Sequence, residues 1–120
     1  ETDPIVMPLE NLKDVVLKDH LKGLKTLNYG LNKKKNSFKV NKKSMFSEWE
    51  VVNAYALGIV YRSNPRKIFI AGFDGFPNDF RKQNEIEKIF QKYKSLKNSK
   101  NLYSITPTSH PKKLIKQIWN

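Results

Sequence analysis

Polar side chains that could contact a ligand follow three apolar runs of this sequence. Asn28 ends the first run, Asp74 follows the second, and positions 104–110 at the end of the third hold four hydroxyl-bearing residues and a histidine. Gly72 and Gly75 flank Asp74, and glycine permits positive φ or close approach of the backbone to a ligand. The Asp74 carboxylate could therefore accept hydrogen bonds from the hydroxyl groups of a ribose or another sugar. The alternative is that the glycines only shape a turn and Asp74 bonds its own backbone.

The third segment could bind phosphate. Thr106, Thr108 and Ser109 offer hydroxyl and amide groups close to the start of an expected helix, where anions bind. The alternative is a proline-stiffened turn whose hydroxyls cap that helix. His110 is the candidate for catalysis, as an acid, a base or a phosphate contact, against the alternative of a surface histidine without a role. Because adjacent side chains diverge, Ser109 and His110 do not form a catalytic pair.

The sequence indicates neither a metal site nor a cofactor site. His20 and His110 lie in separate segments, the carboxylates do not cluster, and cysteine is absent. The sequence also lacks the Gly-x-Gly-x-x-Gly fingerprint and the P-loop that bind dinucleotides and nucleotide phosphates. We therefore expect no metal and no cofactor in this segment.

Alternating helices and strands must position these residues. Ser47 followed by Glu50 fits a capping box, and a stripe of apolar side chains comes after it. The run 67–73 has a continuous apolar centre, which is typical of a parallel strand covered on both faces. Residues 31–46 are rich in lysine and asparagine and are expected to form a loop with one edge strand near 37–40. Apolar spacing predicts helices over 9–24, 47–63, 79–96 and 112–119, and strands over 25–30, 67–73 and 101–105.

This order of elements predicts an α/β fold. Strands and helices that alternate with right-handed crossovers give a parallel sheet between helices. We expect a three-layer Rossmann-like domain with a small, mostly parallel sheet, and the length predicts a single domain over residues 1–120. Because ligands bind outside the carboxyl ends of such strands, Asn28, Asp74 and residues 106–110 should converge at one edge. Asp79 is expected to cap the helix after the Asp74 turn.

The composition limits the classes of partner and the cellular compartment that we expect for this protein. The formal net charge of +12 would suit nucleic acid, but its excess is nearly all lysine, with Arg62, Arg66 and Arg81 as the only arginines. Binders that read bases rely on arginine, and lysine accompanies asparagine and isoleucine here, as in proteins of AT-rich genomes. We therefore assign the charge to a solvated surface and expect no nucleic-acid partner. No apolar run approaches the ~18 residues of a membrane span, and the absence of cysteine suits the cytoplasm.

Four segments resemble one bacterial domain: residues 27–31 (LNYGL), 53–59 (NAYALGI), 66–76 (RKIFIAGFDGF) and 104–109 (SITPTS). They are similar to the C-terminal domain of aldolase-like proteins of the hydroxymethylglutaryl-CoA-lyase superfamily. Those proteins are labelled 4-hydroxy-2-oxovalerate aldolases and are encoded among surface-polysaccharide genes. A more distant resemblance is to bacterial sialyltransferases that use CMP-sialic acid, and it implies that Gly72, Asp74 and Phe76 line a nucleotide-sugar site.

The resemblances imply different functions. The first implies a ligand-binding or regulatory domain of an enzyme of polysaccharide or sugar-acid biosynthesis, with a nucleotide, nucleotide-sugar or sugar acid as ligand. The second implies a glycosyltransferase-like domain with its own activity, although residues 77–83 lack the catalytic histidine of the sialyltransferases. A structural docking domain is the third alternative. Because the chain begins at Glu1 rather than Met, we expect a C-terminal fragment whose partner is the upstream catalytic domain, which would hold the aldolase's metal ligands.

Overall fold

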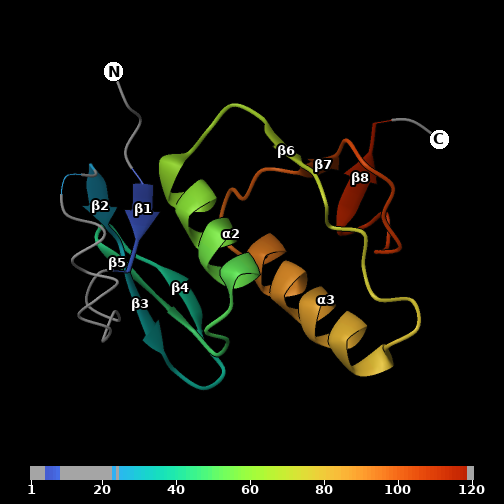
Figure 1. Cartoon of the computed structure of the whole chain (residues 1–120), viewed down its shortest axis with the longest axis horizontal. Coiled ribbons are helices and arrows are strands. Elements are labelled where there is room, and N and C mark those ends of the chain that lie inside the picture. Colours follow the sequence, from blue (N-terminus) through green and yellow to red (C-terminus); the bar gives the residue numbers. More distant parts are fainter. Residues whose placement is uncertain (1–4, 9–22, 24, 119–120) are drawn as a thin grey trace. The chain divides into compact units, whose positions relative to one another are not determined.

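The computed structural model describes residues 5–8, 23 and 25–118 (Figure 1). By its internal contacts the chain divides into two compact units, Glu1–Glu50 (unit 1) and Val51–Asn120 (unit 2). Strands occur in both units, and the described helices belong to unit 2. Helices together with small, mostly parallel sheets confirm the α/β class. The single domain over residues 1–120 stays a prediction.

Unit 1 contains two small sheets in its described residues. β1 (Ile5–Met7) pairs in parallel with β2 (Thr26–Asn28). The second sheet consists of β3 (Gly30–Lys33), β4 (Phe38–Val40) and β5 (Ser44–Ser47), in the order β3-β5-β4. The central strand β5 is parallel to β3 and antiparallel to β4. Among the described residues of this unit, the buried hydrophobic side chains are Tyr29, Leu31 and Met45.

The loop expected over residues 31–46 is wrong, since this segment contributes to β3, β4 and β5, although the expected edge strand is confirmed as β4. Gly30 permits close pairing of β3 with β5, because a β-carbon on it would lie 2.9 Å from Ser44 Cβ. Asn36 adopts a left-handed φ of 56° before β4, which asparagine tolerates well. Short, half-exposed strands need few apolar residues, so they form here within a lysine-rich segment whose composition predicts a loop.

The capping box at Ser47 is also wrong. Ser47 is the last residue of β5, and its carbonyl oxygen accepts the Lys34 N–H at 2.9 Å while its Oγ accepts the Trp49 N–H at 3.0 Å. The helix α2 (Val52–Ser63) begins after Val51, which provides no side-chain cap. A cap contributes only about 1 kcal/mol, so pairing within the sheet outweighs it here. Of the helix expected over 9–24, only Gly23 lies within the described residues.

Unit 2 carries the parallel sheet. After α2 follow β6 (Ile68–Ile70), α3 (Phe80–Lys94), β7 (Leu102–Ser104) and β8 (Ile115–Gln117). The three strands are parallel in the order β6-β7-β8. Asp79 caps α3 as expected, because its Oδ1 accepts the Lys82 N–H at 3.1 Å. Within the described residues, no helix has the length and apolar character needed to cross a bilayer.

One face of this sheet and one stripe of α3 supply the core of unit 2. The strands contribute three buried residues that are neighbours in register, Ile68, Leu102 and Ile115. The helix contributes three buried residues at helical spacing, Ile89, Phe90 and Tyr93. Burying a large apolar side chain contributes about 1.5–3 kcal/mol, so these contacts hold the ends of β6 and β7 in place.

The helix expected over residues 112–119 is wrong where the structure describes this segment. The carbonyl oxygen of Pro111 accepts the N–H groups of Leu114 and Ile115 at 2.9 and 3.1 Å, which closes one helical turn. The chain then extends into β8, where Ile115 is fully buried beside Leu102. Helices shorter than ~12 residues are only marginally stable by themselves. The burial of Ile115 in β8 therefore stabilises the strand over the expected helix.

Candidate ligand-binding pocket

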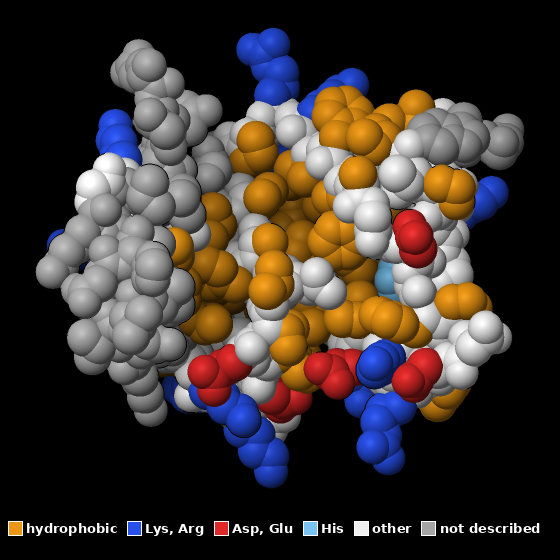
Figure 2. All heavy atoms as spheres, viewed as in Figure 1, with side chains coloured by type: hydrophobic (Ala, Val, Ile, Leu, Met, Phe, Trp, Pro, Cys, Tyr) orange, Lys and Arg blue, Asp and Glu red, His pale blue; other side chains and the backbone are white. Residues whose placement is uncertain are grey.

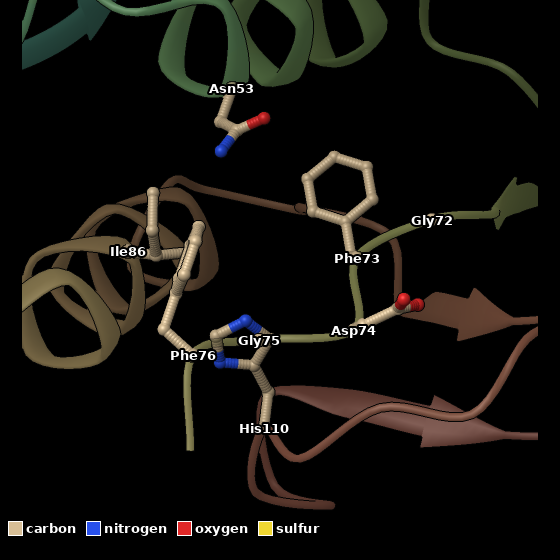
Figure 3. Close-up of a pocket in the computed structure, with 8 residues that line it drawn as sticks. All are labelled: Asn53, Gly72, Phe73, Asp74, Gly75, Phe76, Ile86 and His110. Atoms are coloured by element: carbon tan, nitrogen blue, oxygen red, sulfur yellow. The ribbon is translucent and has the colours of Figure 1, made fainter. Parts of the chain in front are cut away.

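A pocket of about 280 Å³ lies in unit 2 after the carboxyl ends of β6 and β7 (Figure 3). Its lining comprises Asn53 of α2, residues 72–76 after β6, Ile86 of α3 and His110 after β7. This is the edge at which open α/β sheets bind ligands. On the face of unit 2 seen in Figure 2, hydrophobic side chains gather over α2 and between α3 and the strands. Apolar walls with a few polar groups are typical of small-molecule sites.

Two threonines tie the loop after β6 to the loop after β7. Thr106 Oγ1 accepts the Gly72 N–H at 3.0 Å. Thr108 Oγ1 donates to the Phe73 carbonyl oxygen at 2.6 Å and accepts the His110 N–H at 3.2 Å. These hydroxyls hold the pocket loop in place and do not cap a helix. Their contact with phosphate stays a prediction.

Ser109 approaches the loop after β6 still more closely. Its N–H and its Oγ both donate to the Asp74 carbonyl oxygen, at 2.7 and 2.9 Å. Gly75 has a φ of 95°, and a β-carbon on it would lie 2.0 Å from Ser109 Oγ. Gly72 has a φ of 79° with open space around it. Both glycines therefore shape the turn, and Gly75 also admits the neighbouring loop.

His110 lies on the floor of the pocket, with a side chain that is only 1% exposed. Its ring packs edge-on against Phe90, with 5.3 Å between the ring centroids. Gln83 Nε2 lies 3.3 Å from Nδ1 of His110, and Glu87 Oε2 lies 3.6 Å from the same atom. Burial lowers the pKa of His110 below its usual value of 6.5, and Glu87 opposes that effect. At pH 7 the ring is therefore neutral.

The hydrogen bonds of Gln83 favour one tautomer of His110. Gln83 Oε1 accepts the Phe76 N–H at 2.5 Å, so the amide nitrogen of Gln83 faces the other way. That nitrogen donates to Glu87 Oε2 at 2.6 Å and faces Nδ1 of His110. If Nδ1 accepts this N–H, the proton of a neutral ring resides on Nε2. Figure 3 shows the side of the ring remote from Cβ directed into the pocket.

The other predicted residues differ in their relation to the pocket. The Asp74 carboxylate lies on the rim, exposed and directed away from the His110 ring, whereas Asn53 points from α2 into the pocket (Figure 3). Phe76 packs its ring over the pocket beside Ile86 (Figure 3). Asn28 lies on β2 in unit 1 and is not among the residues that line this pocket.

Sequence reasoning missed the polar residues that support His110. Gln83, Glu87 and Phe90 recur at spacings of four and three along α3, which places them on one helical face. The polar pair Gln83 and Glu87, in line with the apolar stripe of α3, was therefore a sequence signal for polar side chains beside the pocket. Asn53 was missed because the helix was assigned a start at Ser47, which hid its place in the first turn of α2.

Neither a metal site nor a relative identifies the ligand. In the part of the chain that the structure describes, no group of three or more His, Cys, Asp or Glu side chains could hold a metal ion. Comparisons with protein-family models, curated proteins and solved structures found no match to this chain. The geometry of the pocket therefore carries the functional argument.

Proposed function

We propose that unit 2 is a Rossmann-like binding domain for a nucleotide or nucleotide-sugar, with its ligand in the pocket after β6 and β7. The observation that carries this proposal is the buried His110, whose Gln83 contact leaves an Nε2–H donor for the pocket. This donor faces the pocket (Figure 3), so a ligand oxygen or nitrogen that accepts its proton would gain a hydrogen bond of about 0.5–1.5 kcal/mol. Carbonyl groups and ring nitrogens of nucleobases are such acceptors.

The size of the pocket limits how much of the ligand it takes. Sites for small molecules measure about 300–1,000 Å³, so a volume of about 280 Å³ is just below that range. It suits one ring system with a short substituent. A nucleotide would therefore place its base in the pocket and leave its phosphates in solvent.

The lining supports this orientation of the ligand. Phe73 and Phe76 present aromatic rings for stacking, and Asn53 adds an amide that can donate and accept. The Asp74 carboxylate on the rim could accept hydrogen bonds from ribose hydroxyls. Lys82, with its Nζ 5.6 Å from the centre of the Phe76 ring, provides a positive charge for the phosphate outside the pocket.

The resemblance to the C-terminal domain of aldolase-like proteins suggests the context of this binding. On that basis we propose that the ligand regulates an adjoining cytoplasmic enzyme of polysaccharide or sugar-acid biosynthesis. The residues that carry the resemblance support this view, because residues 72–76 form the larger part of the pocket lining. Dependence of the adjoining enzyme's rate on the same nucleotide would test it.

Thermal unfolding of the chain with CMP, cytidine and N-acetylneuraminic acid tests the proposed function. A ligand that binds only the folded state stabilises it by about 2.7 kcal/mol at one hundred times Kd. We expect CMP and cytidine to raise Tm, and Asn53→Ala to reduce that shift. Asn84→Ala is the matched control, because Asn84 is exposed on α3 and does not line the pocket. Absence of a shift with all three compounds would contradict the proposal.

A further inference from the structure

The sheet of unit 2 has one face that the described residues of this unit leave open. Phe69, Tyr103 and Lys116 are neighbours in register on β6, β7 and β8, and side chains alternate between the faces of a sheet. Phe69 is 56% exposed, Tyr103 is partly exposed and Lys116 is exposed. We call this surface, formed by Phe69, Tyr103 and Lys116, the open sheet face. The opposite face holds the buried core residues.

Two aromatic rings lie side by side on the open sheet face. The ring centroids of Phe69 and Tyr103 are 6.1 Å apart, with 43° between the ring planes. Alternation continues past the strand ends, where Ile105 and Ile118 are 44% and 51% exposed. Both strands continue their pairing there, because Ile105 N–H donates to the Ile70 carbonyl oxygen and Ile118 N–H to that of Ser104. Neither ring is among the buried core residues.

Basic residues flank the strands of this aromatic pair in the sequence. Arg66 and Lys67 precede β6, and Lys112, Lys113 and Lys116 lie in or before β8, all of them exposed. The sequence contains no Asp or Glu after Glu87 and none between Arg66 and Ala71. The three strands and the residues directly before them therefore carry basic side chains without acidic ones. The acidic residues of unit 2 are on other segments, at Asp74, Asp79, Glu85 and Glu87.

We propose that the open sheet face binds single-stranded nucleic acid. Aromatic rings on an open sheet stack unpaired bases, and neighbouring lysines neutralise the phosphates. Stacking of this kind tolerates any base. It needs none of the arginines that base reading requires, so this proposal departs from the expectation of no nucleic-acid partner, which rested on the scarcity of arginine. This site is independent of the pocket and does not rest on the proposed function.

The charge distribution favours a polyanion over a second copy of the chain. Two copies that paired through this face would bring the Lys116 side chains of both copies onto the shared surface. Like charges on facing surfaces are destabilising. A nucleic acid instead releases counterions when lysines neutralise its phosphates, which is favourable at low salt.

Fluorescence anisotropy of a labelled twelve-nucleotide oligo(dT) with the full chain tests this inference. We expect binding at low salt that weakens as salt increases, and a loss of affinity in Phe69→Ala of about fivefold or more. Phe80→Ala is the matched control, because Phe80 is 85% exposed at the start of α3, and it should bind as the unchanged chain does. Lys116→Gln should reduce the salt dependence, whereas Lys35→Gln in unit 1 should not.

Three outcomes would overturn the inference. The first is no binding of oligo(dT) at low salt. The second is equal affinity of Phe69→Ala and the unchanged chain, which would mean that lysines alone attract the oligonucleotide. The third is a concentration-dependent dimer in sedimentation velocity that Phe69→Ala abolishes, since a second copy would then occupy the face. The melting temperature of Phe69→Ala shows that it remains folded, and its exposed position predicts no loss there.

Discussion

Ser109 Oγ occupies the space that a β-carbon on Gly75 would need, with only 2.0 Å between the two positions. The loops after β6 and β7 cross at this point, and their crossing forms one wall of the pocket. Gly75 also has a φ of 95°, which residues other than glycine rarely adopt. The pocket therefore depends on the absence of a side chain at this position.

Gly75→Ala should destabilise the chain more than Gly72→Ala. Both substitutions place a β-carbon on a residue with positive φ, which costs about 1–2 kcal/mol. Only at Gly75 would that β-carbon also clash with a neighbouring atom, Ser109 Oγ. We expect Gly75→Ala to lower the free energy of unfolding by about 1 kcal/mol more than Gly72→Ala, because Ser109 must move and lose its bond to Asp74. Urea unfolding of both variants measures the difference. Equal losses would show that the loops do not cross this closely.

His110 makes stability depend on pH. Its folded-state pKa is lowered by burial, so between that pKa and about 6.5 the unfolded chain binds a proton that the folded chain does not. Stability is therefore complete above about pH 6.5 and falls as the pH decreases through this window. The free-energy difference between the chain and its His110→Gln variant isolates this contribution. A difference that does not change from pH 7.5 to pH 5 would show that His110 is not buried.

Gln83→Leu should raise the pKa of His110. The substitution removes the donor that favours the neutral ring and leaves Glu87, which favours the charged ring. We also expect a loss of stability of about 1–3 kcal/mol, because Glu87 and Nδ1 of His110 lose a partner. NMR titration of the His110 ring measures the pKa. Gln91→Leu, at an exposed position of the same helix, should leave that pKa unchanged.

Thr108→Val should loosen the pocket without changing its volume. Valine has nearly the shape of threonine but lacks the Oγ1 that joins the Phe73 carbonyl oxygen to the His110 N–H. Loss of these two bonds should cost about 1–3 kcal/mol. Hydrogen exchange of the His110 amide should quicken accordingly. Thr26→Val in unit 1 serves as control and should not alter that exchange.

Local signals predicted much of unit 2 correctly. The apolar run around Phe69 contains β6, and the Asp79 cap and the stripe from Ile89 to Tyr93 each specify structure within a few residues. The expectation that both faces of this strand are covered is wrong, because Phe69 is 56% exposed. Parallel strands bring their carboxyl ends to one edge, so Asp74 and His110 were placed together by topology alone. Both line the pocket in the structure.

Features that depend on distant partners could not be predicted in this way. Ser47 has the local pattern of a cap, but pairing with β3 makes it part of a strand. The sequence around Ile115 has the apolar spacing of a helix, but parallel pairing with Leu102 gives Ile115 the extended backbone of a strand. The contact of Gln83 with His110 joins side chains that are distant in sequence, and only packing of α3 against the loop after β7 brings them together. Single-sequence patterns contain no information about such pairs.

The most direct test of the binding proposal is a long-range proton–nitrogen NMR spectrum of the His110 ring, recorded without and with CMP at pH 7. His20→Gln removes the signals of the other histidine. We predict a neutral ring with its proton on Nε2, and a change in the Nε2 shift when CMP is added. A proton on Nδ1, or a ring whose signals are unchanged by CMP, cytidine and N-acetylneuraminic acid alike, would contradict the proposal.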